Sequence, residues 1–174
     1  KEMKKYIEDV RLPYLKELTR PIATTEETLF RRGNFNGSWD QIICDALIDV
    51  KGAQISLSPG FRWGTSVMPN QTITFDDLMT QTAMTYPETY ARDIKGSEIK
   101  LILEDVADNL FNEDPFLQQG GDMVRTGGIS YKIDPKAKIG SRITNIVLSK
   151  TGEKLDANKS YKVAGWSTVG AKSE

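Results

Sequence analysis

The chain has 174 residues, of which 39% are hydrophobic and 27% are charged, and its formal net charge is −1. This composition is typical of a folded globular domain with a real core, and it argues against a disordered or membrane protein because no run approaches the ~18 apolar residues that a membrane helix needs. The balanced charge, without a basic block, indicates neither a nucleic-acid partner nor an anionic membrane surface.

Two residue counts limit the chemistry. The chain contains no histidine, so it has no Ser-His or Cys-His nucleophile pair, no imidazole metal ligand and no general base naturally tuned near neutral pH. Its one cysteine, Cys44, rules out an internal disulfide and leaves the redox compartment undecided. The chain starts without methionine or a signal peptide, which predicts a piece of a longer protein.

The N-terminal half alternates helical and strand-like segments. Residues 2–19 carry an apolar helical stripe that Pro13 is expected to divide. A strand-like stretch at 22–32 and a Gly/Asn turn follow. Ser38 then predicts the N-cap of a second helix at 39–50.

The segments after this helix begin with an apolar run at 53–58, which predicts a buried strand. Thr74 is expected to cap a short helix whose first turn carries Asp76 and Asp77, favourable partners for its N-terminal dipole. A strand-like alternation follows at 89–96.

The C-terminal half contains the clearest helix, at 98–111, opened by Ser97. Three strand signals come after it, at 128–135, 142–149 and 160–167. Mixed helices and strands in one stretch predict an α+β fold, with a single domain built on a mixed β-sheet with flanking helices. We expect residues 1–20 to form an interdomain connector helix and residues 21–174 to form the domain itself.

Six short motifs, taken in order, resemble the C-terminal domain of the 5′-nucleotidase family. Each motif alone is weak, but their order makes the resemblance strong. They are "ICDA" at 43–46, the loop through Arg62, "TFDDL" at 74–78, "GSEIK" at 96–100, "GISY" at 128–131 and "LDANKSYKVA" at 155–164.

Within this family, the chain is more similar to the SoxB-type thiosulfohydrolase branch than to nucleotidases. The segments that carry this similarity are "SPGFRWG" at 58–64, "TYPETY" at 85–90, "QQGGDMVRTGGISY" at 118–131 and "AGWSTV" at 164–169. The resemblance implies a periplasmic hydrolase that releases sulfate from a thiosulfonated cysteine on the C-terminal tail of a sulfur-carrier protein. It also implies an N-terminal metallophosphatase-like domain with two manganese ions, so that this chain has no cofactor or catalytic residue of its own.

Two other functions remain open. The chain is alternatively the C-terminal domain of a nucleotidase or related phosphoesterase, whose base-stacking loop would lie beyond residue 168. It is otherwise a stand-alone peptide-binding module. An upstream coding region with metal-ligand motifs would exclude the module.

The loop after the predicted buried strand provides the main candidate ligand group, Arg62. Its guanidinium is suited to a tetrahedral anion such as a sulfonate. The resemblance favours this role over that of a surface arginine stacked on Phe61 or Trp63. These two rings either wall a narrow channel or pack beneath the loop. Gly60 belongs to the same candidate loop.

Two further loops carry candidate substrate-binding residues. Tyr86 and Glu88 are candidates to face the same cleft, although proline beside tyrosine is also ordinary turn chemistry. Gly120 and Gly121 allow a positive φ and the close approach of an extended peptide.

Asp122 and Arg125 follow the paired glycines. These two side chains either contact the partner or pair with each other across a turn.

The remaining reactive side chains are expected to be structural. Cys44 is predicted to be a buried cysteine rather than a nucleophile, because no cation nearby lowers the pKa of its thiol. Glu104 and Asp105 are expected to be solvated. No group of carboxylates has the spacing of a metal site.

Overall fold

The computed structural model describes residues 1–60, 64–82 and 88–166. The chain divides into two compact units, Lys1–Phe30 with Trp63–Met84, and Arg31–Arg62 with Thr85–Glu174. In the described ranges, no helix combines the length and the apolar character needed to cross a membrane.

The first unit contains the N-terminal helical segment and a small ribbon. Its elements are α1 (Glu2–Arg11), η1 (Leu12–Tyr14), α2 (Leu15–Leu18), β1 (Pro21–Thr24), β3 (Thr72–Thr74) and α4 (Phe75–Thr82). The predicted division of the first helix at Pro13 is confirmed, because the proline lies in η1 between two α-helices. β1 and β3 pair antiparallel.

The predicted cap of α4 is also confirmed. Thr74 Oγ1 accepts a 3.3 Å hydrogen bond from the Asp77 nitrogen, and Asp77 Oδ2 accepts from the backbone nitrogen and hydroxyl of Thr74, each 2.7 Å long. Asp76 forms an ion pair with Arg11, 2.6 Å between Nη2 and Oδ2. Both carboxylates therefore hold the start of α4 in place.

The second unit is built on a four-stranded sheet in the order β4-β8-β2-β5. β2 and β8 are parallel, and the other pairs are antiparallel. A separate hairpin is formed by β6 and β7. The strands of this unit are β2 (Ile55–Ser58), β4 (Thr89–Lys95), β5 (Arg125–Gly127), β6 (Ile129–Ile133), β7 (Ile143–Leu148) and β8 (Ser160–Trp166).

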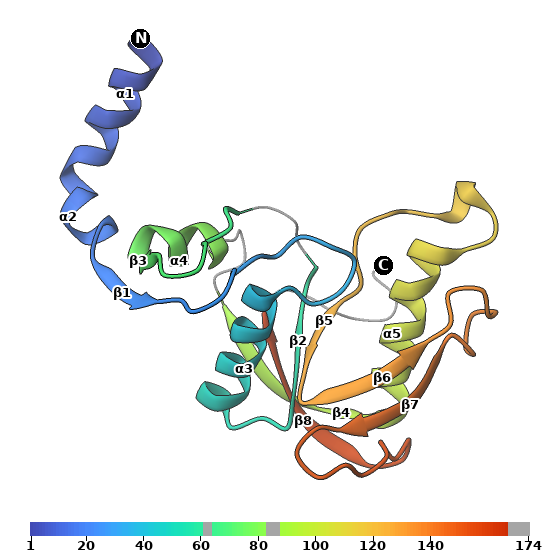
Figure 1. Ribbon diagram of the computed structural model, residues 1–174. Helices are drawn as coiled ribbons and strands as arrows, with labels where there is room; N and C mark the ends of the chain where they lie inside the picture. Colours follow the sequence, from blue (N-terminus) through green and yellow to red (C-terminus); the bar gives the residue numbers. More distant parts are fainter. Residues whose placement is uncertain (61–63, 83–87, 167–174) are drawn as a thin grey trace. The chain divides into compact units, whose positions relative to one another are not determined.

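Two long helices, α3 (Ser38–Lys51) and α5 (Gly96–Phe111), pack on opposite faces of this sheet (Figure 1). Side chains of β2 alternate between the faces, as strand geometry requires. Ile55 and Leu57 join the main core with Ile99 and Leu103 of α5. Ser56 faces α3, where its side chain lies beside Cys44.

Cys44 is confirmed as a buried structural residue, since its exposed fraction is 0%. Burial is the main cause that raises the pKa of its thiol to about 12. The thiolate is therefore scarce at neutral pH, which is the opposite of what a nucleophile needs.

The α+β class and the mixed sheet with flanking helices are confirmed, with corrections at two positions. Gly37 rather than Ser38 is the N-cap of α3, and the carboxylate of Asp40 accepts a hydrogen bond from the Gly37 nitrogen. Glu104 is not solvated: it is 2% exposed and accepts three backbone hydrogen bonds, from Gly140, Arg142 and Ile143. Backbone nitrogens just before β7 and at its start thus donate hydrogen bonds to this carboxylate.

A short η2 helix (Pro115–Leu117) follows α5 and leads to residues 118–124 before β5. Gly120 and Gly121 have φ values of +82° and +90°, as the paired glycines predicted.

Candidate functional site

One edge of the four-stranded sheet brings together the segments that the sequence singled out. β2 and β8 are parallel, so their carboxyl ends lie at the same edge, and the antiparallel strands β4 and β5 begin there. The register pairs Ser58 with Arg125 and Thr89 with Trp166. We call this end of the sheet, marked by these four residues, the site edge.

Gly60 packs directly against the segment before β5. A Cβ atom at Gly60 would lie 2.6 Å from the carbonyl oxygen of Met123 and 2.7 Å from Cβ of Asp122. Only a residue without a side chain fits this contact undisturbed. The backbone at Gly60, just after β2, therefore packs tightly onto residues 122–123.

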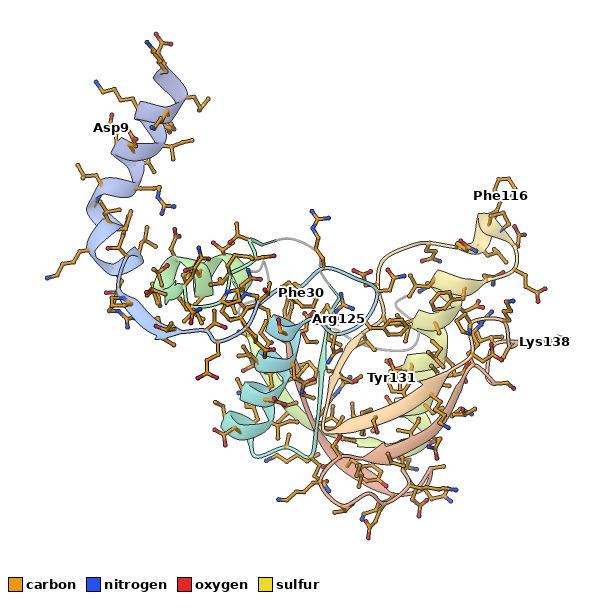
Figure 2. The ribbon with its side chains drawn as sticks, in the orientation of Figure 1. Asp9, Phe30, Phe116, Arg125, Tyr131 and Lys138 are labelled. Atoms are coloured by element: carbon orange, nitrogen blue, oxygen red, sulfur yellow. The ribbon has the colours of Figure 1, made fainter. Side chains whose placement is uncertain are left out.

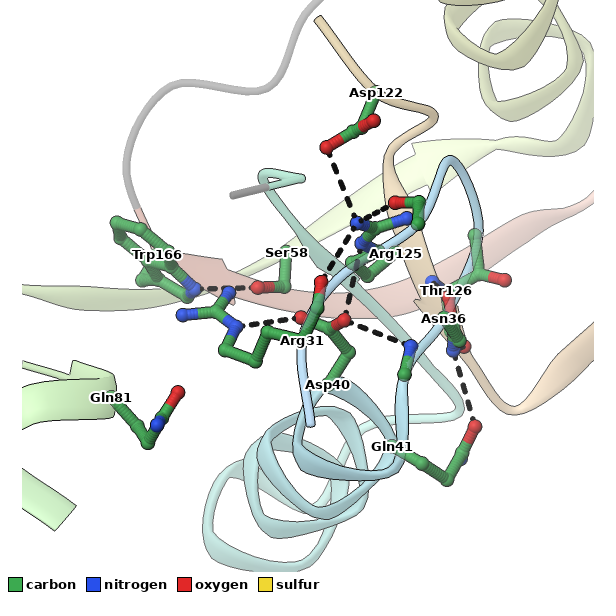
Figure 3. Close-up of polar contacts among 12 residues, drawn as sticks. Arg31, Asn36, Asp40, Gln41, Ser58, Gln81, Asp122, Arg125, Thr126 and Trp166 are labelled. Carbon is green, nitrogen blue, oxygen red and sulfur yellow. Dashed lines mark hydrogen bonds and ion pairs between the residues drawn. The ribbon is translucent and has the colours of Figure 1, made fainter. Parts of the chain in front are cut away.

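A buried ionic network lies beneath this contact (Figure 3). Asp40 Oδ1 accepts a 2.8 Å hydrogen bond from Arg31 Nε, and Asp40 Oδ2 lies 3.2 Å from Arg125 Nε. Arg125 Nη2 also lies 3.5 Å from Asp122 Oδ2 and donates to the carbonyl of Gly33 at 2.7 Å. All four ionic side chains are at most 2% exposed.

The network holds two guanidinium groups and two carboxylates, so its charges balance. Such a buried group is costly when one partner is removed, because a charge then remains without compensation. It links residues 31–33, the start of α3, residues 122–123 and β5. The network therefore joins these segments into one layer beneath the site edge.

Two further contacts complete the support. Asn36 donates to the carbonyl of Thr126 at 2.9 Å and accepts from the Thr126 nitrogen, as a backbone strand would. Trp166 Nε1 donates a 2.7 Å hydrogen bond to Ser58 Oγ, which ties the end of β8 to the end of β2. Figure 3 shows both contacts around the same cluster.

Tyr90 of β4 pairs with Gly165 of β8, next to the pair of Thr89 and Trp166 at the site edge. Its hydroxyl would meet a Cβ atom of Gly165 at 2.5 Å, so glycine leaves room for the ring. The guanidinium of Arg92 lies over that ring, 5.1 Å from its centroid. Burial raises the pKa of Tyr90, and the hydroxyl has no hydrogen-bond partner among the described residues.

The predicted site residues are distributed as follows. Gly60, Asp122 and Arg125 come together at the site edge, with Glu88 exposed immediately before β4. Gly120 and Gly121 are exposed on the segment that leads to Asp122. The others, Phe61, Arg62, Trp63 and Tyr86, lie outside the described residues.

Of the two arrangements left open for Asp122 and Arg125, the structure shows the pair across the turn. Both side chains are closed off from solvent in this chain. The contact of these two residues with a substrate stays a prediction. Their observed contacts belong to the buried ionic network beneath the site edge.

Arg31 and Asp40 are important residues that the sequence did not single out. Asp40 stands at the third position of α3, where a carboxylate is typical of a helix start. This position is the one feature of the sequence that indicates a structural role for Asp40. Its ion pairs with Arg31 and Arg125 depend on the tertiary fold. In the described parts of the chain, no group of three or more His, Cys, Asp or Glu residues could hold a metal ion.

The chain matches the family described as 5′-nucleotidase, C-terminal domain, over residues 21–173. This range includes parts of both compact units. No curated protein sequence matches the chain.

Among solved structures, the chain is similar to the Thermus thermophilus sulfate thiohydrolase SoxB in complex with glycerol. The identity is 36%, the match covers 95% of this chain and 30% of that protein, and the TM-score is 0.89. A 5′-nucleotidase precursor, also from Thermus thermophilus, matches at 21% identity, 94% and 32% coverage and a TM-score of 0.72. The NAD nucleotidase of Haemophilus influenzae matches at 17% identity, 95% and 31% coverage and a TM-score of 0.71.

The chain thus spans about a third of the length of these solved relatives. The two nucleotidases share its fold, and the family match extends over most of its residues. The chain belongs to the 5′-nucleotidase C-terminal domain family.

Proposed function

We propose that this chain is the C-terminal substrate-recognition domain of a SoxB-like hydrolase. The complete enzyme releases sulfate from a thiosulfonated cysteine on the tail of a sulfur-carrier protein in the periplasm. The observation that carries this proposal is the similarity to SoxB, at 36% identity and a TM-score of 0.89 over 95% of the chain.

The site edge supports the proposal through its close packing and buried ion pairs. A clamp for a small tetrahedral anion must hold its donors in fixed positions, because misplacement by about 1 Å is costly in catalysis. Gly60 is packed on Asp122 and Met123, and the ion pairs of Asp40 fix the layer beneath. Arg62, two residues after Gly60, would grip the terminal sulfonate with its fork of donors.

The proposed reaction is a hydrolysis at sulfur. The oxygen of water bonds to the terminal sulfonate sulfur, the sulfur–sulfur bond breaks, and its electron pair passes to the sulfur that stays on the carrier. Sulfate leaves, and the protons of water are released or taken up by that sulfur. This chain would orient the tail and offset the sulfonate charge, while the two manganese ions that activate water would be held by the preceding domain.

A nucleotidase is the second candidate, since the family match and the fold are shared with nucleotidases. It would bind a phosphate ester at the same site edge and stack a base on a loop after β8. The two functions differ in the bond that is hydrolysed, so one assay separates them.

The test uses the full-length parent protein loaded with manganese. We would measure sulfate release from a thiosulfonated cysteine peptide and phosphate release from AMP. Sulfate release without AMP turnover supports the proposal. AMP turnover without sulfate release would contradict it and identify a nucleotidase.

A further inference from the structure

Phe116 is the most exposed large apolar side chain of the described residues. It is 94% exposed, and its neighbour Leu117 is 58% exposed. Figure 2 shows Phe116 at the tip of the segment that follows α5. We call Phe116 and Leu117 the apolar tip. Burying an aromatic ring of this size against a partner is strongly favourable.

Hydrogen bonds hold the apolar tip in this position. Asp114 Oδ1 accepts from the Phe116 nitrogen at 2.9 Å, and Asn112 Oδ1 accepts from the Asp114 nitrogen at 2.9 Å. Gln118 Nε2 closes the loop by donating to the Asn112 carbonyl at 2.7 Å. The ring is therefore presented on an ordered turn, and less conformational freedom is lost when a partner binds it.

The base of the loop is anchored as well. Arg142 donates to the carboxylate of Asp108 and to the carbonyl of Phe111, and Asn112 also bonds to Asp108. On the far side, the Gly120 nitrogen donates to the Asn109 carbonyl at 3.1 Å. Both ends of the loop are thus fixed to the last turns of α5.

The surroundings of the apolar tip indicate the kind of partner. Its chain neighbours Glu113, Asp114, Gln118 and Gln119 are exposed and polar, two of them acidic. A small apolar centre with a polar rim is typical of a transient protein interface. Met3, Ile7, Val10 and Tyr14 form a longer exposed apolar stripe. Its length suits a permanent interface rather than a transient one.

The same segment connects the apolar tip to the site edge. Leu117 and Asp122 are five residues apart, so they lie within about 18 Å of each other even if the chain between them is fully extended. Asp122 in turn packs against Gly60. A folded protein that grips the apolar tip can therefore place a short tail at the site edge.

We propose that the apolar tip is the docking anchor for the folded body of the sulfur-carrier protein, which rests on the function proposed above. The matching surface of the carrier is an apolar pocket bordered by Lys or Arg. The carrier tail reaches the site edge while Phe116 occupies this pocket, so the anchor selects the protein and the site edge selects the sulfonate.

The test compares two substrates of the full-length parent that bear the same thiosulfonated cysteine, the intact carrier protein and its free tail peptide. For Phe116→Ala we expect KM for the carrier to rise about tenfold or more, as for an interface hot spot, with kcat unchanged. The kinetics of the free peptide should not change. Leu101→Ala, which removes an apolar side chain 54% exposed on α5, should change neither.

Three results would overturn the inference. The first is unchanged carrier kinetics in Phe116→Ala while the wild type is active. The second is an equal loss with both substrates and a lowered melting temperature, which would place the ring in an internal contact of the parent. The third is sulfate release by the wild type from neither substrate, which would instead refute the proposed function and remove the basis for a carrier.

Discussion

Asp40 Oδ2 lies 3.2 Å from Arg125 Nε, and neither side chain has any exposed surface. The same carboxylate holds Arg31 at 2.8 Å and accepts a hydrogen bond from Gly37. One residue at the start of α3 thus fixes two cations from distant parts of the chain. The layer below the site edge depends on it.

We therefore expect Asp40→Asn to destabilise the chain by about 3–5 kcal/mol, because the buried guanidinium groups of Arg31 and Arg125 would each lose a charged carboxylate partner. Urea unfolding followed by circular dichroism measures this loss. Asp45→Asn, at an exposed position of the same helix, is the matched control and should stay within about 0.5 kcal/mol of wild type. Equal stabilities of the two variants would contradict the role of Asp40.

Gly60→Ala tests the contact with residues 122–123. The added methyl would lie 2.6 Å from the carbonyl oxygen of Met123, so the loop must move, at a cost of about 1–3 kcal/mol. In the parent, we expect a higher KM for the thiosulfonated peptide. Gly152→Ala, whose added Cβ would have nothing within 4 Å but is strained by a φ of +72°, is the control for an effect of backbone strain alone on KM. A Gly60→Ala enzyme with normal KM and stability would show that the contact has no functional role.

Glu104→Gln tests the carboxylate that the sequence led us to place in solvent. Its two oxygens accept from the nitrogens of Gly140, Arg142 and Ile143. An amide would present a donor to at least one of them, for a loss of about 1–3 kcal/mol. Thermal or urea unfolding measures it, with the neighbouring half-buried Asp105→Asn as control. A loss no larger than in Asp105→Asn would contradict this account.

The alternation and helical stripes predicted most of the fold, because they report which face of an element is buried. Ile99 and Leu103, on one stripe, do lie in the core. β5 was missed because three residues, Arg125–Gly127, are too short for a periodic signal. Asp40 and Arg125 are far apart in sequence, and no local pattern links them. The prediction that Glu104 is solvated was wrong because its partners are backbone nitrogens of residues 140–143, which no local pattern around α5 indicates.

The candidate site was predictable to a smaller extent. The sequence singled out Gly60, Asp122 and Arg125, and these residues do meet at the site edge. It did not indicate that Arg125 would be fully buried, because burial of an arginine depends on the carboxylates that surround it. The buried ionic network beneath the site edge could therefore be recognised only from the three-dimensional structure.

A pH dependence is expected from the pair of Asp108 and Arg142. Burial alone would raise the pKa of Asp108, but hydrogen bonds from Arg142 and Asn112 outweigh it and lower the pKa below its ordinary 3.8. The ionised carboxylate thus stabilises the fold above pH 3.8, and this contribution is lost as the pH falls through the lowered value.

Asp108→Asn should consequently cost about 1.5–3 kcal/mol at pH 7, as for a hydrogen bond to a charged group. The difference from wild type should shrink in acid, below the ordinary pKa. Urea unfolding at a series of pH values measures it. A difference that stays constant down to the acid limit would show that the charge of Asp108 is not what stabilises the fold.

The most direct test of the central claim is sulfate release from a thiosulfonated cysteine peptide by the full-length parent and its Arg62→Ala variant. Lys132→Ala, which removes an exposed cation from β6, is the matched control. We predict that Arg62→Ala lowers kcat/KM about 100-fold or more, as expected for a charged group that binds the reacting anion, and that Lys132→Ala is unaffected. Full activity in Arg62→Ala would contradict the account of the site edge as an anion clamp.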